Sequence, residues 1–480
     1  MSDELARIRE TKRKLSQVSP SFCLAKWLQV TVHLQNGHTH SCHHPDTHSV
    51  PMKELSDNPS ALHNTSKKMK LRQAMLQGTR PEECDYCWKI EDTSADLISD
   101  RHIKSNDDWA SPFFDEVKAL PWDYAINPTY MEVSFSNRCN FKCAYCAPHV
   151  SSQWMDEIQK FGPYPTLGRY QNLDKIIRTG KMPIPENQPN PFVDAFWKWW
   201  PELYQNLKVF RITGGEPLLN KNTFKILDYI KDHPRPELEL AINSNLGLPE
   251  KLITRLIDKL SPITDSTHLK QCSIFTSIDT WGKQAEYIRH GLKHDQFWKN
   301  VERLLDAAKD EARNVQLIFM CTFNALSITQ FKPLLEKILE LKSKYKIFFD
   351  ISFLRSPEHL SVKILTSDFN IQVKKLLEFM ESKTVSSDRK IGFREFETNK
   401  LNRVYQWMLR PEDLKWQTRS RSDFYHFIIE HDRRRKTNFL ASFPEMTNFF
   451  ELCKKDTLYS EFMDRLIEKK RLYGFQPQPE

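Results

Sequence analysis

The chain lacks the long apolar segments that proteins use to enter or cross membranes. Across its 480 residues, no apolar run approaches the roughly 20 residues of a membrane-spanning helix. No apolar segment follows the basic N-terminus, as one would in a secretory signal peptide. We therefore expect a cytoplasmic protein without membrane contact, in which disulfides are the least expected use of the 10 cysteines.

Sequence repeats and a strong charge of one sign are missing as well. The formal net charge is +8, a mild excess for this length, and no segment repeats. One dense basic cluster, residues 433–436, lies near the C-terminus beside Arg419 and Arg421. We interpret this cluster as a solvated helix end, and the alternative is a grip on a phosphate or an acidic substrate segment.

Three closely spaced cysteines are the most informative feature that is present. Cys139, Cys143 and Cys146 form a C-x3-C-x2-C pattern on a loop after the strand-like residues 130–135. Thiolates this close can converge on one metal centre, and they favour zinc or iron–sulfur clusters. A structural zinc site takes four protein ligands, whereas three leave one metal position open. The pattern alone is also compatible with a zinc knuckle or with incidental thiols.

A second motif follows the next predicted strand. Residues 207–213 alternate like a strand and lead into Gly214, Gly215 and Glu216. Paired glycines allow a ligand to approach the backbone closely, and a neighbouring carboxylate can hold an ammonium group. Behind the cysteine triplet, this motif predicts a ligand-binding site at neighbouring strand ends.

In this order, the two motifs resemble those of radical SAM enzymes, in which an aromatic residue such as Tyr145 precedes the third cysteine. The resemblance implies that the three thiolates bind three irons of a [4Fe–4S] cluster, and that S-adenosylmethionine chelates the fourth. It also implies an electron donor such as flavodoxin or ferredoxin, and cleavage of the sulfonium to a 5′-deoxyadenosyl radical. That radical abstracts hydrogen from an unreactive carbon, and no catalytic residue is assigned beyond the cluster.

Further cofactor contacts come from the same resemblance. It implies that Glu216 binds the methionine amino group, and that Ser277 and Arg289 hold the methionine carboxylate. Residues 243–247 resemble the strand ending that many relatives carry as Thr-Asn-Gly. The full set expected to bind S-adenosylmethionine is Gly214, Gly215, Glu216, Ser244, Asn245, Ser277, Asp279, Arg289 and Tyr145.

The order of strand-like and helical segments predicts an α/β fold. Strand-like runs alternate with helical patterns, which implies βαβ units and a parallel sheet. Six such repeats match the partial (β/α)6 TIM-like barrel of radical SAM enzymes, and they would place both motifs at the carboxyl ends of the strands. The predicted strands lie near residues 130–135, 207–213, 237–243, 272–278, 314–321 and 346–353.

Four further cysteines form a second constellation before the barrel. Cys23 and Cys42 bracket a hairpin signal at residues 36–37, and Cys84 and Cys87 form a C-x2-C pair. This arrangement resembles the twitch domain, a shortened SPASM domain that binds an auxiliary [4Fe–4S] cluster and that follows the barrel in most relatives. Four thiolates also suit a zinc site, which stays open as the alternative.

Six histidines crowd the same hairpin, and three more cysteines lie elsewhere in the chain. We interpret the histidines as a polar surface loop, with metal binding as the alternative, and neither cluster needs one as a ligand. The remaining thiols lie in strand-like or helical runs and are expected to be small core residues. The histidines are His33, His38, His40, His43, His44 and His48, and the cysteines are Cys272, Cys321 and Cys453.

These patterns divide the chain into four parts. We expect a charged tail over residues 1–20, a small twitch-like hairpin-and-helix domain over 21–100, the barrel over 128–355, and a helical region over 356–480. The segment 161–206, rich in proline and aromatic residues, is an insertion that serves either as a substrate lid or as a packing belt. The helical region carries no cofactor motif and is expected to cap the barrel or to contact substrate.

The sequence therefore predicts a radical SAM enzyme with an auxiliary-cluster domain. Twitch and SPASM relatives often modify peptides or proteins, so a peptide or protein substrate is favoured by analogy alone. One alternative is a radical SAM enzyme that acts on a nucleotide, sugar or RNA, which the basic C-terminal cluster would suit. Another is a non-enzymatic zinc- or cluster-binding protein that contacts nucleic acid or serves as a scaffold.

Overall fold

A nine-stranded sheet forms the centre of the structure, a computed structural model that describes residues 2–94, 96–310, 313–387 and 390–459. The strand order is β11-β10-β8-β7-β6-β4-β1-β2-β3. Six neighbouring strands of the barrel segment run parallel, as the sequence predicted. They are β4 (Tyr130–Ser134), β6 (Val209–Thr213), β7 (Arg235–Ser244), β8 (Leu269–Ser277), β10 (Val315–Phe323) and β11 (Ile347–Phe353).

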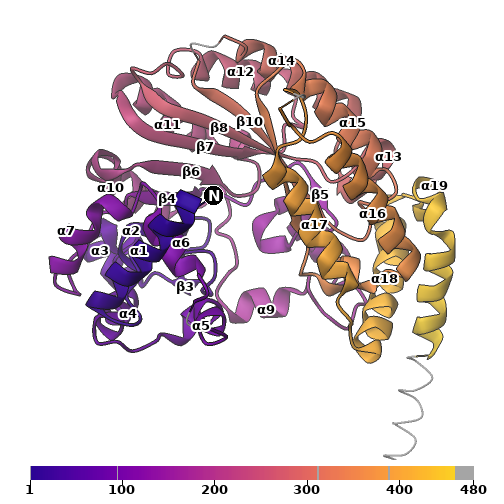
Figure 1. Ribbon diagram of the computed structural model, residues 1–480, viewed down its shortest axis with the longest axis horizontal. Helices are drawn as coiled ribbons and strands as arrows, with labels where there is room; N and C mark the ends of the chain where they lie inside the picture. Colours follow the sequence, from indigo (N-terminus) through magenta and orange to yellow (C-terminus); the bar gives the residue numbers. More distant parts are fainter. Residues whose placement is uncertain (1, 95, 311–312, 388–389, 460–480) are drawn as a thin grey trace, which may run out of the picture.

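Helices between these strands pack their apolar faces against the sheet (Figure 1). In α12 (Glu250–Leu260), the buried residues Ile253, Leu256 and Leu260 recur at helical spacing and form one stripe. The other crossover helices are α11 (Lys221–Asp232), α13 (Gly282–Ile288), α14 (His294–Ala307) and α15 (Phe331–Lys342). This alternation of strands and helices confirms the predicted α/β fold with a parallel core.

The N-terminal hairpin continues the barrel sheet instead of forming a sheet of its own. β1 (Gln29–His33) pairs in parallel with β4 and antiparallel with β2 (His38–His40), and a short β3 (His48–Ser49) follows. The predicted turn between β1 and β2 is present, with Gly37 at φ +68°. The hairpin could be predicted because its turn signal is local, whereas the pairing of β1 with β4 joins distant segments.

Helices surround this hairpin and form a second hydrophobic core, in which Leu15 and Trp27 are buried. Leu15 belongs to α1 (Ser2–Val18), so the segment 1–20, expected to be a charged tail, is largely a helix docked on this core. Leu15 and Val18 give the helix an apolar side, which suffices for docking although most of its residues are polar. The other helices of the unit are α2 (Ala25–Leu28), α3 (Met52–Asp57), α4 (Ser66–Leu76), α5 (Asp85–Glu91), α6 (Asp100–Asn106) and α7 (Phe114–Ala119).

The insertion between β4 and β6 has two parts that differ in burial. Its last helix, α10 (Pro191–Asn206), buries Phe196, Trp199 and Trp200 in the main core, as a packing belt would. The segment before it is mostly exposed and contains α9 (Leu173–Arg178). Helix α10 therefore acts as the predicted packing belt, whereas the role of the exposed segment as a substrate lid stays a prediction.

The C-terminal region is helical, as predicted, and lies at the opposite end of the sheet from the N-terminal unit (Figure 1). Its helices include α16 (Ser367–Ser382), α17 (Glu395–Leu409), α18 (Leu414–Arg435) and α19 (Phe439–Ser442). Within the helical region expected over 356–480, residues 451–459 are helical, and residues 460–480 lie outside the described residues. No helix in the described part of the chain has both the length and the apolar character needed to span a membrane.

The three cysteines outside the two constellations are core residues, as predicted. Cys272 and Cys453 are 0% exposed, and Cys321 is 1% exposed. Burial raises the pKa of all three thiols, so they stay protonated and uncharged.

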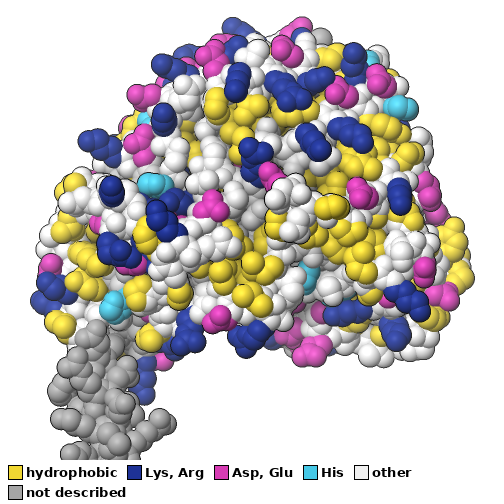
Figure 2. Space-filling model, turned by 180° about the vertical axis from the view of Figure 1, so that it is seen from behind, with side chains coloured by type: hydrophobic (Ala, Val, Ile, Leu, Met, Phe, Trp, Pro, Cys, Tyr) yellow, Lys and Arg dark blue, Asp and Glu magenta, His cyan; other side chains and the backbone are white. Residues whose placement is uncertain are grey.

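Positive and negative side chains are interspersed over the face of the molecule shown in Figure 2. The net charge of +8 is therefore not gathered there into one basic field. The charge distribution of this face therefore does not favour long-range attraction of an anionic partner.

Candidate functional site

The cysteine triplet lies on the loop that follows β4, at the carboxyl end of the parallel strands. Part of this loop forms β5 (Lys142–Cys143), which pairs antiparallel with β9 (Arg289–His290). Cys143 lies opposite Arg289 in this pairing, and Arg289 Nη1 donates a hydrogen bond to Cys143 Sγ at 3.6 Å. The structure thus brings a predicted cofactor residue into contact with a predicted cluster ligand.

All three thiols of the triplet are partly buried. Burial raises the pKa of Cys146 to about 12, and it raises the pKa values of Cys139 and Cys143 as well. Neighbouring thiols of the triplet raise the pKa of Cys139 and Cys146 further, because like charges disfavour one another. A bound metal would supply the compensating positive charge and displace the protons.

The Gly-Gly-Glu motif packs directly against the cysteine loop. Gly214 has φ +121°, a conformation that favours glycine. A Cβ atom on Gly215 would lie 2.2 Å from the carbonyl oxygen of Arg138, so a side chain there would displace the loop. The backbone N–H of Glu216 donates to the same carbonyl oxygen at 2.7 Å. Both glycines therefore position the cysteine loop, a packing role that the sequence motif did not reveal.

Glu216 is buried, and the predicted residues Ser244 and Asn245 hold its carboxyl group. Ser244 Oγ donates to Glu216 Oε1 at 2.8 Å, and the backbone N–H of Asn245 donates to Oε2 at 2.7 Å. Burial raises the pKa of Glu216 to about 7, although these donors act in the opposite direction. The group is thus divided between its neutral and charged forms near neutral pH, and a nearby cation would favour the charged form.

Asn140 links the end of β7 to the cysteine loop, and it was not among the predicted site residues. Its Oδ1 accepts from Asn245 Nδ2 at 2.8 Å, and its Nδ2 donates to the carbonyl oxygen of Gly247 at 2.8 Å. The only signal in the sequence was a polar residue inside the C-x3-C spacing. Through these bonds and those of the Gly-Gly-Glu motif, the ends of β6 and β7 both contact the loop.

A second polar group joins Arg289, Asp279 and Tyr145. Arg289 Nε lies 2.8 Å from Asp279 Oδ2 in a buried ion pair, and Tyr145 OH donates to the same oxygen at 2.9 Å. Arg289 Nη2 donates in turn to Tyr145 OH. Burial alone would lower the pKa of Arg289, but Asp279 and Tyr145 raise it well above its ordinary value. Ser277 ends β8, and within the described residues it has no hydrogen bond to this group.

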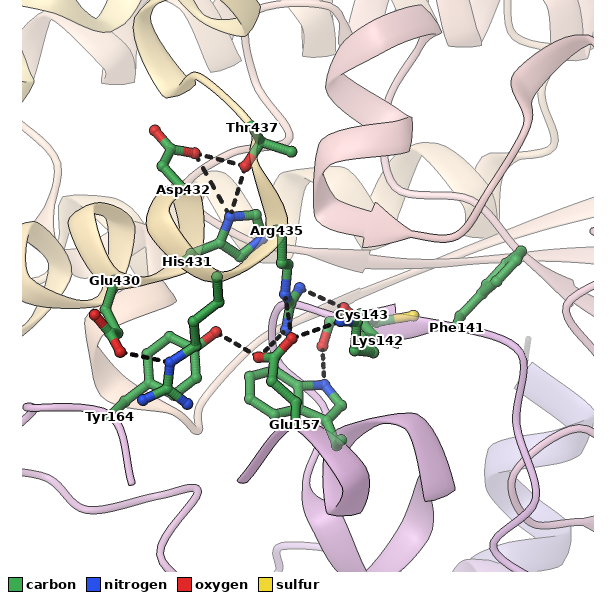
Figure 3. A network of polar contacts seen from close by, with 12 residues as sticks. Phe141, Lys142, Cys143, Glu157, Tyr164, Glu430, His431, Asp432, Arg435 and Thr437 are labelled. Atoms are coloured by element: carbon green, nitrogen blue, oxygen red, sulfur yellow. Dashed lines mark hydrogen bonds and ion pairs between the residues drawn. The ribbon is translucent and has the colours of Figure 1, made fainter. Parts of the chain in front are cut away.

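Helix α18 contacts the cysteine loop from outside the predicted site (Figure 3). Arg435 Nη1 donates to the carbonyl oxygen of Lys142 at 2.7 Å, and Arg435 Nε lies 3.1 Å from Glu157 Oε2. Glu157 also accepts from Tyr164 OH at 2.7 Å and from Lys142 Nζ at 2.6 Å. Burial opposes the ionisation of Glu157, but Arg435, Lys142 and Tyr164 together outweigh it and the pKa falls to about 2.

This network corrects the interpretation of the basic cluster at residues 433–436 as a solvated helix end for two of its four residues, while Arg433 and Lys436 are exposed as predicted. Arg434 and Arg435 are buried, and Arg434 donates to the carbonyl oxygens of residues 162 and 163 at 2.9 and 3.0 Å. Buried charges persist only when they are paired, which makes these two arginines unavailable to an anionic substrate. No local pattern predicts this pairing, because Glu157 lies 278 positions from Arg435 in the chain.

The four N-terminal cysteines converge on one small cavity. Cys23, Cys42, Cys84 and Cys87 all line it. Burial raises the pKa of Cys84 and of Cys87 to about 12, and Cys23 and Cys42 lie close enough to raise both further. The structure thus brings the two predicted pairs together, at a place separate from the triplet.

One further group of potential metal ligands lies close to the four N-terminal cysteines. In the part of the chain that the structure describes, ligand atoms of His43, His44 and Asp100 all lie within 4.8 Å of one another. His44 and Asp100 also line the cavity of the four cysteines. Four thiolates suit a zinc ion as well as an iron–sulfur cluster, so the kind of metal at this cavity stays a prediction.

The histidines of the hairpin do not form a polar surface loop, contrary to the prediction. His38 and His40 are buried, and the rings of His33 and His40 stack with centroids 5.4 Å apart. The insertion covers this side, since the carbonyl oxygen of Gly180 lies 3.1 Å from His38 Nε2. Burial lowers the pKa of His33 to about 3, so the ring is neutral, while His43 remains exposed.

Known proteins match the chain mainly over the barrel. Residues 133–338 match the family model of the radical SAM superfamily. This segment begins in β4 and ends in α15, so it contains the cysteine triplet, the Gly-Gly-Glu motif and Arg289.

Curated relatives match parts of the chain at low identity. GTP 3',8-cyclase of Aliarcobacter butzleri is 28% identical over 181 residues, which are 38% of this chain and 43% of that protein. GTP 3',8-cyclase of Campylobacter lari is 24% identical over 242 residues, which are 48% of this chain and 62% of that protein. The chain thus spans 43% to 62% of the length of these two relatives.

Among solved structures, SuiB of Streptococcus suis bound to S-adenosylmethionine is 11% identical, with a TM-score of 0.35 over 76% of this chain and 71% of that chain. The family match and the convergence of the motifs concern the same part of the molecule. A match to this superfamily implies a [4Fe–4S] cluster and S-adenosylmethionine for the matched segment. Residues 133–338 therefore form a radical SAM domain.

Proposed function

We propose that Cys139, Cys143 and Cys146 hold a [4Fe–4S] cluster at which S-adenosylmethionine is reductively cleaved. A cluster held there would supply one electron, received from an external donor, for cleavage of the sulfonium to methionine and a 5′-deoxyadenosyl radical, which would abstract hydrogen from the substrate. The observation that carries the proposal is the contact between the triplet loop and the Gly-Gly-Glu motif at neighbouring strand ends. The N–H groups of Gly215 and Glu216 fix the loop from which all three thiols extend.

In this proposal, Glu216 receives the amino group of S-adenosylmethionine. Its carboxyl group is buried and already oriented by Ser244 and Asn245. An ammonium group beside it would complete its ionisation through a charge-assisted hydrogen bond. Ser244 and Asn245 would then act by orienting the carboxylate, while Gly214 and Gly215 keep the loop in place.

Arg289 is proposed to face the carboxylate of S-adenosylmethionine, together with Ser277 at the end of β8. Asp279 and Tyr145 hold the guanidinium on two sides, so it is oriented before the cofactor binds. Its contact with Cys143 Sγ places the same cation beside a cluster ligand. Hydrogen bonds to ligating sulfurs tune the reduction potential of an iron–sulfur cluster, which gives Arg289 a second expected role.

We further propose that the N-terminal unit, residues 21–100, carries a second [4Fe–4S] cluster. Its four cysteines line one cavity, apart from the triplet, and this convergence supports the proposal. A cluster there would pass electrons or anchor substrate. The likeness of this unit to a twitch domain stays a prediction, and in this chain the unit shares a sheet with the barrel.

Two substrate classes follow from different observations. A peptide or protein substrate rests on the resemblance of the N-terminal unit to twitch domains. A nucleotide is favoured by the curated relatives, which are named for a reaction of GTP, and by a cavity lined with basic residues beside the triplet. We place the nucleotide first, because two independent observations support it.

Release of 5′-deoxyadenosine from reduced, anaerobically reconstituted protein tests the proposed function without knowledge of the substrate. Wild-type protein should release it slowly from S-adenosylmethionine, and Cys143→Ala should release none because a cluster ligand is lost. Cys453→Ala removes a buried thiol outside both cysteine sets, so it is the matched control and should behave as wild type. No release by wild-type protein with its full iron content would overturn the proposal.

A further inference from the structure

A cavity of about 500 Å³ lies beside the cysteine triplet. Three separate parts of the chain line it, namely the loop after Cys146, the insertion between residues 168 and 181, and C-terminal residues within 356–359 and 419–423. Its volume lies within the range of small-molecule sites, which is roughly 300–1,000 Å³. The cavity thus has the size and the location of a substrate site.

Four basic side chains line this cavity, namely Arg169, Lys175, Lys181 and Arg419. None of the four forms an ion pair within 4.0 Å in the described part of the chain. The two acidic residues of the lining are already engaged. Asp423 accepts from the backbone N–H groups of Leu167 and Gly168 at 2.6 and 2.9 Å, and Glu358 accepts from Trp416 Nε1 at 3.1 Å. An anion is the ligand that would balance this lining.

Helix α18 carries two kinds of arginine, those that are buried in ion pairs and one that is free to bind a ligand. On α18, Arg434 and Arg435 are buried and paired with the loop and with acidic groups. Arg419, nearer the start of the helix, is exposed and lines the cavity. Arg434 and Arg435, at the end of α18, therefore contribute to packing, whereas Arg419 is available to a ligand.

Two histidines of the lining carry buried ring nitrogens that have no hydrogen-bond partner among the described residues. These atoms are His149 Nδ1 and His359 Nε2. Buried polar groups are normally hydrogen-bonded, so unpaired nitrogens in residues that line a cavity indicate a ligand or water there. Burial lowers the pKa of His149 to about 4 and that of His359 to about 3, so both rings are neutral near pH 7 and offer hydrogen bonds without charge.

The cavity reaches the cysteine triplet through two of its lining residues. Ala147 directly follows Cys146 in the chain. Tyr170 is partly buried, which raises its pKa to about 12, and it lies close enough to Cys146 for that thiol to contribute. A group held by the basic residues would therefore place a neighbouring part of the same molecule near the triplet.

We propose that this cavity binds the phosphate groups of a nucleotide substrate, an inference that rests on the proposed function. The ligands are the side chains of Arg169, Lys175, Lys181 and Arg419. Phosphate concentrates several negative charges in a small volume, and both arginine and lysine bind it well. An acidic peptide spreads its charges along an extended chain, and extended chains usually bind along grooves or sheet edges. The compact cavity favours the phosphate.

Calorimetric titration of the reconstituted full chain with GTP and with inorganic pyrophosphate tests this inference without turnover. Both probes should bind, and their affinity should fall as salt rises because the charges are screened. Lys175→Gln and Arg419→Gln should each weaken binding about tenfold, since each removes one charge-assisted contact. Lys299→Gln and Arg403→Gln make the same charge change at exposed positions outside the cavity and should bind as wild type.

Failure of wild-type protein to bind either probe, or equal losses in the variants and the controls, would overturn the inference. Tighter binding of a hexaglutamate peptide than of pyrophosphate would also overturn it and would assign the cavity to an acidic peptide. Failure of the proposed function would appear differently, as the absence of 5′-deoxyadenosine from wild-type protein. The binding assay requires no cleavage of S-adenosylmethionine, so the two failures are distinguishable.

Discussion

Glu216 is a buried acid whose ionisation depends on its surroundings. Burial raises its pKa to about 7, so the neutral form prevails below that pH and the carboxylate above it. The affinity for the cationic amino group of S-adenosylmethionine should therefore rise with pH, as long as the amino group keeps its proton. From about pH 6 to about pH 7.5 we expect a gain of roughly five- to tenfold, measured by equilibrium dialysis.

Glu216→Gln is the control for this prediction, because the amide does not titrate and its weaker affinity should stay flat over the same range. An affinity of wild-type protein that falls as pH rises would contradict a role of the carboxylate in binding the amino group.

Single residues could be predicted where their chemical type and short spacing are themselves the signal. The triplet thiols and Glu216 belong to this class, and the structure places them at adjoining loops. Asn140 and Arg435 do not, because their roles come from partners that lie far away in the sequence. A sequence pattern indicates the chemical role that a residue can have, but it does not predict which distant residue will contact it in the folded chain.

Helix α18 meets the cysteine loop through the buried pair of Arg435 and Glu157. Arg435→Met would leave Glu157 without its main cation and free the carbonyl oxygen of Lys142. We expect a loss of about 3–5 kcal/mol in the free energy of unfolding, measured by urea denaturation. Arg433→Met, at the exposed end of the same helix, should leave the free energy of unfolding nearly unchanged, since that side chain is 59% exposed and its ion pair is screened by water.

Equal losses in the two variants would show that α18 contributes to stability through general packing instead of this pair. Combining Arg435→Met with Glu157→Leu should recover part of the loss, because it removes the unpaired carboxylate as well.

Elements with a strong local pattern were predicted correctly, and those that depend on distant packing were not. The six parallel strands alternate with amphipathic helices, which fixes their type from local sequence. The docking of α1 and the burial of His38 and His40 depend on surfaces supplied by other parts of the chain. The hydrophobic periodicity of a segment does not predict which distant segment will cover it.

Two separate sets of cysteines imply a defined metal content for the whole molecule. If each set holds a [4Fe–4S] cluster, anaerobically reconstituted protein should contain about eight irons and eight sulfides. Cys84→Ala with Cys87→Ala should lose about half of the iron, whereas Cys272→Ala with Cys453→Ala, two buried core thiols, should lose none. Stoichiometric zinc without iron in the wild type would contradict both cluster assignments.

β1 keeps β4 from becoming an open edge of the barrel sheet. In a chain that begins at residue 128, the N–H and C=O groups of β4 that face β1 would lose their partners. Such an edge is a template for pairing with another molecule, so we expect this shortened chain to self-associate more than the full chain in size-exclusion chromatography with light scattering. A monodisperse shortened barrel would contradict this expectation. The N-terminal unit is therefore a built-in strand cap as well as a carrier of cysteines, and exchanging it for another domain would require a replacement strand.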